Sequence, residues 1–378
     1  MDKVLSNNSA DRQTDRNYAL DIYRFLCMFL ITSIHLKYIQ IESIVAESTI
    51  NSFSLYVLQT FELIGINGFV LISAFYLSKS VFSIKRIINF WIQLIFYSVF
   101  IFSIMTLLKG FSVRAFLKSF FPIMTQHYWY STDYIILLSV APFLNRLISA
   151  LNRSEFSCLL LVTFFVEALL LSANIFYDCE IYFGHNSHSI LWFIFLYLIA
   201  AFIQKYGLKV RTSTLLIIFW SAWLVAFAYM FVESYHHSIG RLKNFQIIQN
   251  NGVCALVMTV SSFELFRRLG CYVQHGKLCS FIKFVTPALF AVYIIQEHDS
   301  VRSFFWEEEI TTYVLPITHN PIIIAGIAFA FLLFSAVVLN SIYMLMKKAF
   351  LDSVSDYLSL KIPYINLNNI NRNDRNNE

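Results

Sequence analysis

Long apolar runs recur along the chain and constrain its fold more than any other feature. A helix that crosses a bilayer needs roughly 20 mainly apolar residues, and about ten such runs occur among the 378 residues. Hydrophobic residues make up 58% of the chain and charged residues only 13%, a balance typical of membrane proteins. We therefore expect an all-α integral membrane protein, a single bundle of about ten transmembrane helices. The expected spans are 18–36, 55–78, 84–108, 128–148, 156–176, 189–204, 213–232, 247–266, 281–297 and 321–346.

The positive residues predict how this bundle is oriented. With the N-terminus inside, 20 of the 28 Lys and Arg residues fall in inner segments and 7 in outer loops, while Arg24 lies within the first span. Cytoplasmic loops of membrane proteins carry this excess, so we expect both termini in the cytoplasm and the bilayer as a partner. The net charge of +5 is therefore no reason to expect a nucleic-acid partner.

Three segments follow from this layout. Residues 1–17 are a polar cytoplasmic segment, residues 18–350 form the transmembrane bundle, and residues 351–378 form a cytoplasmic tail. The end of the tail is Asn-rich and has nothing to pack, so we expect the tail to be disordered.

The first span carries Asp21, Arg24 and His35 among apolar residues. Charged groups in hydrocarbon cost free energy, so each is a candidate functional residue. Eleven residues at 100° each come within about 20° of three full helical turns, which predicts that Arg24 and His35 share one face. Asp21 precedes Arg24 by three positions and is its expected partner. A snorkelling arginine and an unconnected interfacial histidine remain the alternative.

Other polar residues fall within or beside the spans. Glu62, Asp133 and His298 lie toward the outer side and are candidates to orient His35 or to contact a substrate, with hydrogen bonding inside the bundle as the alternative.

Some polar residues have simpler explanations. Glu264 is followed by Arg267 and Arg268, so we expect a local ion pair there rather than a catalytic carboxylate. His185 and His188 are two loop histidines, which are more often solvated than metal ligands, so no metal is expected.

One motif resembles the signature of the integral-membrane acyltransferase 3 family. Leu20-Asp21 precedes Arg24, and ten residues separate Arg24 from His35; the first helix of that family carries Arg-x(10)-His. The further similar elements are Phe69-Val70-Leu71-Ile72-Ser73-Ala74-Phe75, Lys85-Arg86, Trp129-Tyr130 and "TPALFAVYIIQEH" at 286–298. This sequence has Ala74 and Gln296 where the family motifs have Gly and His.

The resemblance implies acyl transfer, usually of acetyl from acetyl-CoA to a sugar hydroxyl of a bacterial surface polysaccharide or its lipid-linked precursor. It implies a multi-pass enzyme of the bacterial cytoplasmic (inner) membrane, here without an added soluble domain. Acetyl-CoA would be the co-substrate. The alternative is a glycan flippase or polymerase of the same pathway, although a polymerase is expected to carry a large external loop and a flippase more spans.

Within that activity the polar residues take expected roles. Arg24, Lys85 and Arg86 suit the phosphates of the donor, and Arg24 and His35 are the expected catalytic residues. Imidazole suits a general base near neutral pH, and a covalent acyl carrier is the alternative for His35. Supporting or acceptor-side roles are expected for Asp21, Glu62, Ser73, Trp129, Asp133 and His298.

Overall fold

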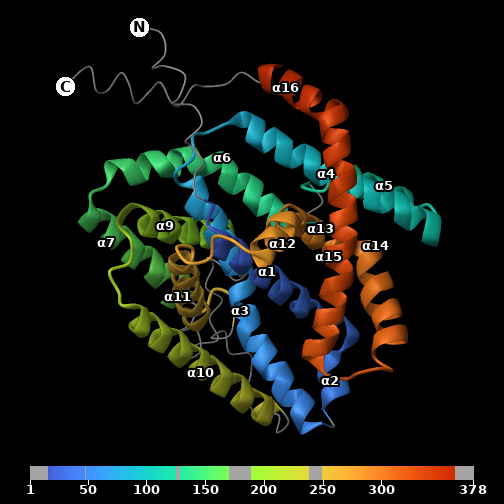
Figure 1. The fold of residues 1–378 in the computed structure, drawn as a ribbon, viewed down its shortest axis with the longest axis horizontal. Helices are drawn as coiled ribbons and strands as arrows, with labels where there is room; N and C mark the ends of the chain where they lie inside the picture. The colour runs from blue at the N-terminus through green and yellow to red at the C-terminus, as the bar shows by residue number, and fades with distance from the viewer. Residues whose placement is uncertain (1–15, 47, 125–127, 170–188, 238–248, 362–378) are drawn as a thin grey trace.

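A computed structural model describes residues 16–46, 48–124, 128–169, 189–237 and 249–361. Within these ranges the chain forms helices joined by short loops, and no strand is present. The expected all-α fold is therefore confirmed. Figure 1 shows the helices gathered into one bundle, with α10 at the lower left and the long α15 on the right, where α5 and α14 extend beyond it.

The element bounds follow the apolar runs closely. The first half comprises α1 (Tyr18–Ser33), η1 (Ile34–Ile39), α2 (Ile41–Val45), α3 (Thr49–Leu77), α4 (Ile84–Lys109), α5 (Val113–Phe120), α6 (Trp129–Ala150), α7 (Arg153–Phe164) and η2 (Phe165–Leu169). The second half comprises α9 (Ile190–Tyr206), α10 (Thr212–His237), α11 (Val253–Leu269), α12 (Lys277–Val285), η5 (Thr286–Ala288), α13 (Leu289–Glu297), α14 (Asp299–Arg302), η6 (Ser303–Val314), α15 (Pro321–Met346), η7 (Lys347–Leu351) and α16 (Asp352–Lys361).

Seven helical stretches in the described ranges are long and apolar enough to cross a membrane, as an integral membrane protein requires. They are Tyr18–Ile39, Thr49–Leu77, Ile84–Lys109, Trp129–Ala150, Thr212–Val232, Lys277–Glu297 and Pro321–Lys361. The apolar helix α9 is shorter. The expected spans 156–176 and 247–266 correspond to α7 and α11, of 12 and 17 residues, and extend into residues outside the described ranges.

The tail differs from its expected state. Residues Asp352–Lys361 form α16, which packs against α4, where a disordered segment was expected. Lys85 at the start of α4 forms an ion pair with Asp356 on α16. The part of the tail beyond Lys361 lies outside the described ranges.

Helix α1 lies near the centre of the bundle and contacts α3, α11, α12, α13 and α15 (Figure 1). Asn17 caps its N-terminus by accepting the Leu20 N–H at 3.1 Å. Gly68 allows α3 to approach, since a Cβ there would lie 2.6 Å from Cys27 Sγ and 2.8 Å from Tyr23 Oη. Close contact through small residues is the usual packing of membrane helices.

The end of α1 changes the expected alignment of Arg24 and His35. The α-helix stops at Ser33 and continues as the 3₁₀-helix η1, which has about 120° per residue. Nine α-helical steps and two 3₁₀ steps bring His35 about 60° past three turns from Arg24, rather than about 20°. The two side chains therefore diverge toward different neighbours.

Glu264 on α11 forms the expected local ion pairs. Its carboxylate accepts from Arg267 Nε at 2.7 Å, Arg267 Nη2 at 2.8 Å and Arg268 Nε at 2.7 Å. Arg268 also donates to the Leu208 carbonyl at 3.0 Å, and Asn17 donates to the Arg267 carbonyl at 3.0 Å. This Glu264 cluster, of Glu264, Arg267 and Arg268, ties the end of α11 to the starts of α1 and α10.

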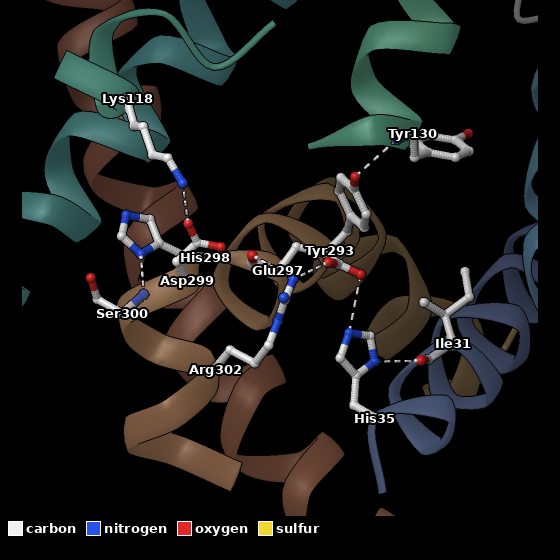
Figure 2. A network of polar contacts seen from close by, with 10 residues as sticks. All are labelled: Ile31, His35, Lys118, Tyr130, Tyr293, Glu297, His298, Asp299, Ser300 and Arg302. Atoms are coloured by element: carbon white, nitrogen blue, oxygen red, sulfur yellow. Dashed lines mark hydrogen bonds and ion pairs between the residues drawn. The ribbon is translucent and has the colours of Figure 1, made fainter. Parts of the chain in front are cut away.

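The segment from α12 to η6 is a helical path with two interruptions. Pro287 lies in the 3₁₀ turn η5, and His298 adopts an extended ψ of 122° between α13 and α14. His298 Nδ1 accepts the Ser300 N–H at 3.3 Å and so caps α14. The break places Glu297 at the last turn of α13, facing the end of α1 (Figure 2).

Candidate active site

His35 is held by bonds to both of its ring nitrogens. Nδ1 lies 3.0 Å from the Ile31 carbonyl oxygen, and Nε2 lies 3.1 Å from Glu297 Oε1 (Figure 2). Because a carbonyl oxygen can only accept, Nδ1 carries a hydrogen and Nε2 is the nitrogen that can exchange a proton. The side chain of His35 is buried, at 4% exposure.

Glu297 links His35 to Arg302. Arg302 Nη2 donates to Glu297 Oε2 at 2.7 Å and to the Glu297 carbonyl at 3.2 Å. The contact between His35 Nε2 and Glu297 Oε1 contains one hydrogen, so one of these two atoms is the donor and the other the acceptor. We refer to His35, Glu297 and Arg302 as the His35 cluster.

Aromatic side chains orient the imidazole. Trp306 on η6 stacks on it with ring centroids 5.8 Å apart and an interplanar angle of 17°. Tyr38 lies on another side at 5.6 Å. Trp306 is fully buried, so the ring of His35 is held between protein groups rather than exposed to solvent. Such packing holds a catalytic side chain in one rotamer.

A cavity of about 260 Å³ opens beside the cluster. Helices α1, α3, α6 and α13 supply most of its wall. The lining residues are Met28, Ile31, Ile34, His35, Lys37, Tyr38, Ile66, Phe69, Trp129, Tyr130, Phe290, Tyr293, Glu297 and Arg302. An apolar and aromatic wall with a few convergent polar groups is the usual composition of a small-molecule site.

Arg24 and Asp21 lie away from this cavity. Arg24 Nη1 is 3.6 Å from Asp21 Oδ1, which is the expected pairing, and Asp21 Oδ2 also accepts from Arg16 at 2.5 Å. The Arg24 guanidinium carbon lies 5.9 Å from the centroid of Phe69, and its Nε is buried without a hydrogen-bond partner. Phe69 also lines the cavity, so one aromatic ring separates Arg24 from the site of His35.

Lys85 and Arg86 both have partners of their own. Lys85 is paired with Asp356, and Arg86 donates to Ser80 Oγ at 2.7 Å. A ligand with phosphate groups would have to exchange with these contacts.

The supporting candidates divide into two groups. Trp129 lines the cavity, and His298 is buried directly after Glu297. Ser73 donates to the Phe69 carbonyl at 3.0 Å along α3, while Asp133 is partly buried on α6 and is not part of the cavity wall. Glu62 lies beside Ser33 and within electrostatic reach of Lys37.

The most informative residues of the site were not singled out from the sequence. Glu297, Arg302 and Trp306 lie 262 or more positions from His35. Glu297 stands between the two positions, 296 and 298, at which the motif suggested a polar role. The sequence clue to Glu297 was its place as a carboxylate at the end of a membrane-length apolar run, four positions after Tyr293. In the structure the Tyr293 hydroxyl accepts the Tyr130 N–H at 3.1 Å.

A metal centre finds no support in the part of the chain that is described. No group of three His, Cys, Asp or Glu side chains there is arranged to hold an ion. His185 and His188 lie outside the described residues.

A larger hollow of about 700 Å³ lies among α4, η6 and α15. Its wall is apolar apart from Glu309 and Ser335, and Tyr313 lies at its edge. Its wall contains no histidine, whereas imidazole titrates near neutral pH, so we take the cavity at His35 as the candidate active site.

A membrane helical bundle with a buried imidazole–carboxylate pair beside a cavity is suited to a group transfer that moves a proton. The sequence profile of the acyltransferase 3 family, described as an acyltransferase domain, matches residues 17–345. The chain therefore belongs to this family and is a multi-pass membrane acyltransferase. Searches of curated proteins and of solved structures found no match.

Proposed function

We propose that this protein transfers an acetyl group from cytosolic acetyl-CoA to a sugar hydroxyl of a bacterial surface polysaccharide or its lipid-linked precursor. It would act in the bacterial cytoplasmic membrane. The family supports acyl transfer within a bilayer. The observation that carries the proposal further is the 3.1 Å contact between His35 Nε2 and Glu297 Oε1 on the wall of a cavity, since transfer to a hydroxyl requires a group that removes its proton.

The pair can manage both protons of the reaction. The acceptor oxygen attacks the thioester carbonyl and forms the new C–O bond, while its proton passes to the lone pair of His35 Nε2, which Glu297 releases at this step by keeping the hydrogen of their contact. The C–S bond then breaks, and the proton on Nε2 passes to the sulfur, releasing CoA as a thiol. One hydrogen enters and one leaves, so the pair returns to its starting state.

A general base and an acyl carrier would both use the lone pair of His35 Nε2, because Nδ1 donates to the Ile31 carbonyl. Either role therefore requires Glu297 Oε1 to move away from Nε2. We favour acid–base catalysis over a covalent acyl-histidine, because an acyl-imidazole is labile.

Membranes from cells expressing the protein provide the test. We expect consumption of labelled acetyl-CoA that depends on added surface glycan, with the label recovered as an alkali-labile ester. Membranes carrying His35→Ala at equal protein level are the matched control. Glycan-dependent consumption that is equal in both preparations, or absent from both, would exclude this assignment and favour a transport or assembly role.

A further inference from the structure

Two cations converge on one aromatic ring at the cavity wall. Lys37 Nζ lies 5.3 Å and Arg302 Cζ lies 5.0 Å from the centroid of Tyr38. All three residues line the cavity that contains His35. Positive charge is therefore gathered on one side of the space in which a substrate would react.

The two cations are not neutralised equally. Arg302 uses Nη2 on Glu297, while its Nε is buried and has no hydrogen-bond partner. Lys37 is exposed and forms no ion pair with any residue in the described ranges. Glu62 interacts with Lys37 electrostatically without forming an ion pair and does not line the cavity.

The other lysines on this part of the molecule provide a contrast. Lys109 pairs with Glu308 at 2.6 Å, and Lys118 pairs with Asp299 at 2.8 Å (the latter in Figure 2). Lys37 thus differs from both in lacking a carboxylate at ion-pair distance. A cation without such a partner at a cavity wall is available to a ligand.

We propose that Lys37, Tyr38 and Arg302 form a subsite for an anionic group, a phosphate or a carboxylate, on the acceptor that is acylated at the His35–Glu297 pair. This inference rests on the proposed function only in calling the bound molecule the acceptor. The subsite itself is defined by charge and geometry. Guanidinium and ammonium groups are the usual ligands of such anions. The anionic group would contact Arg302 and Lys37 beside the ring of Tyr38, where all three residues line the cavity.

The size of the cavity limits what carries the charge. At about 260 Å³ it lies at the lower end of the ~300–1,000 Å³ typical of ligand sites. It therefore suits one sugar unit rather than an oligosaccharide. The charge would lie on the sugar that is acylated, or on the group linked directly to it.

Binding to the purified full-length protein in detergent, without acetyl-CoA, tests the subsite. The probes are glucose 1-phosphate, methyl β-glucuronide and the neutral methyl β-glucoside, titrated by calorimetry. We expect the wild type to bind at least one anionic probe more tightly than the neutral one. A preference for the phosphate alone or the carboxylate alone would identify which anion the acceptor carries.

Three variants test whether the preference for an anionic probe arises at Lys37, Tyr38 and Arg302. Lys37→Gln should weaken anionic binding roughly 3- to 10-fold, as expected for one partly exposed charge contact, and leave the neutral probe unchanged. Glu62→Gln, at a position that does not line the cavity, should leave the preference for the anionic probe in place. Arg114→Gln, at an exposed cation on α5 outside the cavity, is the matched control and should have no effect.

Equal affinity of the charged and neutral probes in wild type, or no binding of either anionic probe, would overturn the proposal. A preference that survives Lys37→Gln would also overturn it. These outcomes are separate from the fate of the proposed function, because no acyl transfer is measured. An enzyme that transfers acetyl but shows no charge preference would retain the function and lose the subsite.

Discussion

The His35 cluster and the Glu264 cluster are both built around one carboxylate with two nitrogen-bearing partners, yet their surroundings differ. In the Glu264 cluster the partners are three and four positions away on the same helix, and both carboxylate oxygens accept from guanidinium groups. In the His35 cluster Arg302 is five positions from Glu297 but His35 is 262 positions away, and a cavity of about 260 Å³ opens beside the cluster.

We therefore assign a structural role to the Glu264 cluster and propose a functional one for the His35 cluster. Arg267 and Arg268 satisfy Glu264 and tie α11 to its neighbours. His35, Glu297 and Arg302 all line the cavity, and Nε of Arg302 has no hydrogen-bond partner. Unused bonding capacity beside a cavity is what a substrate requires.

The largest expected effect is on reporter location, which is either external or internal and shows the side of the membrane that each cluster faces. Reporter fusions after residues 45 and 310 should report an external location, and fusions after residues 82 and 208 an internal one. The excess of Lys and Arg in the inner segments is the physical reason. An inverted pattern would place the His35 cluster on the side of the cytosolic donor and reverse the comparison.

The next effect is the loss of catalysis. His35→Ala should lower acyl transfer by roughly 10²–10⁴-fold, the usual contribution of acid–base catalysis. Glu297→Gln should lower it to a similar extent, and the double variant should lose little more, since residues that act as a unit are not additive. Initial rates with labelled acetyl-CoA, at matched protein level, are the measurement. Fully multiplicative losses would show that the two residues act separately.

Arg24 is expected to act on the donor. Arg24→Ala should weaken turnover by about 10- to 100-fold, mainly through the KM for acyl-CoA, because a charge-assisted bond to phosphate is lost. Arg24→Lys should restore only part, since an ammonium lacks the bidentate fork. Steady-state kinetics across acyl-CoA concentrations measure both. Unchanged kinetics in Arg24→Ala would indicate that Arg24 only anchors α1.

The smallest expected effect on turnover comes from the Glu264 cluster. Glu264→Gln should leave the specific activity near wild type but cost roughly 1.5–3 kcal/mol of stability, the range for hydrogen bonds to charged groups. Thermal denaturation in detergent, followed by size-exclusion chromatography, measures the loss of stability. A stable but inactive Glu264→Gln protein would contradict the structural role assigned to this cluster.

Two interactions between near neighbours on a helix could be predicted from the sequence, and the distant pair of His35 and Glu297 could not. The pairs of Glu264 with Arg267 and Arg268, and of Asp21 with Arg24, follow from helical spacing. His35 was a candidate because a polar group in an apolar helix is costly. Its partner Glu297 could not be derived, since the choice depends on how α1 and α13 pack.

Two local features of the structure also could not be predicted from the sequence. The change from α-helix to 3₁₀-helix at Ile34 rotates His35 away from the stripe of Arg24, and no Pro or Gly marks it. The pairing of Lys85 with Asp356 uses a tail segment whose polar composition resembles that of disordered chains. In both cases tertiary contacts outweigh the local preference.

The 262 residues that separate His35 from Glu297 also have a consequence during biosynthesis. At about 5–20 residues per second, the ribosome needs roughly 13–50 s to make that stretch. A nascent or truncated chain thus carries the imidazole without its carboxylate. Under the proposed mechanism such a chain would not transfer an acyl group, so activity would begin only after the second half has been inserted.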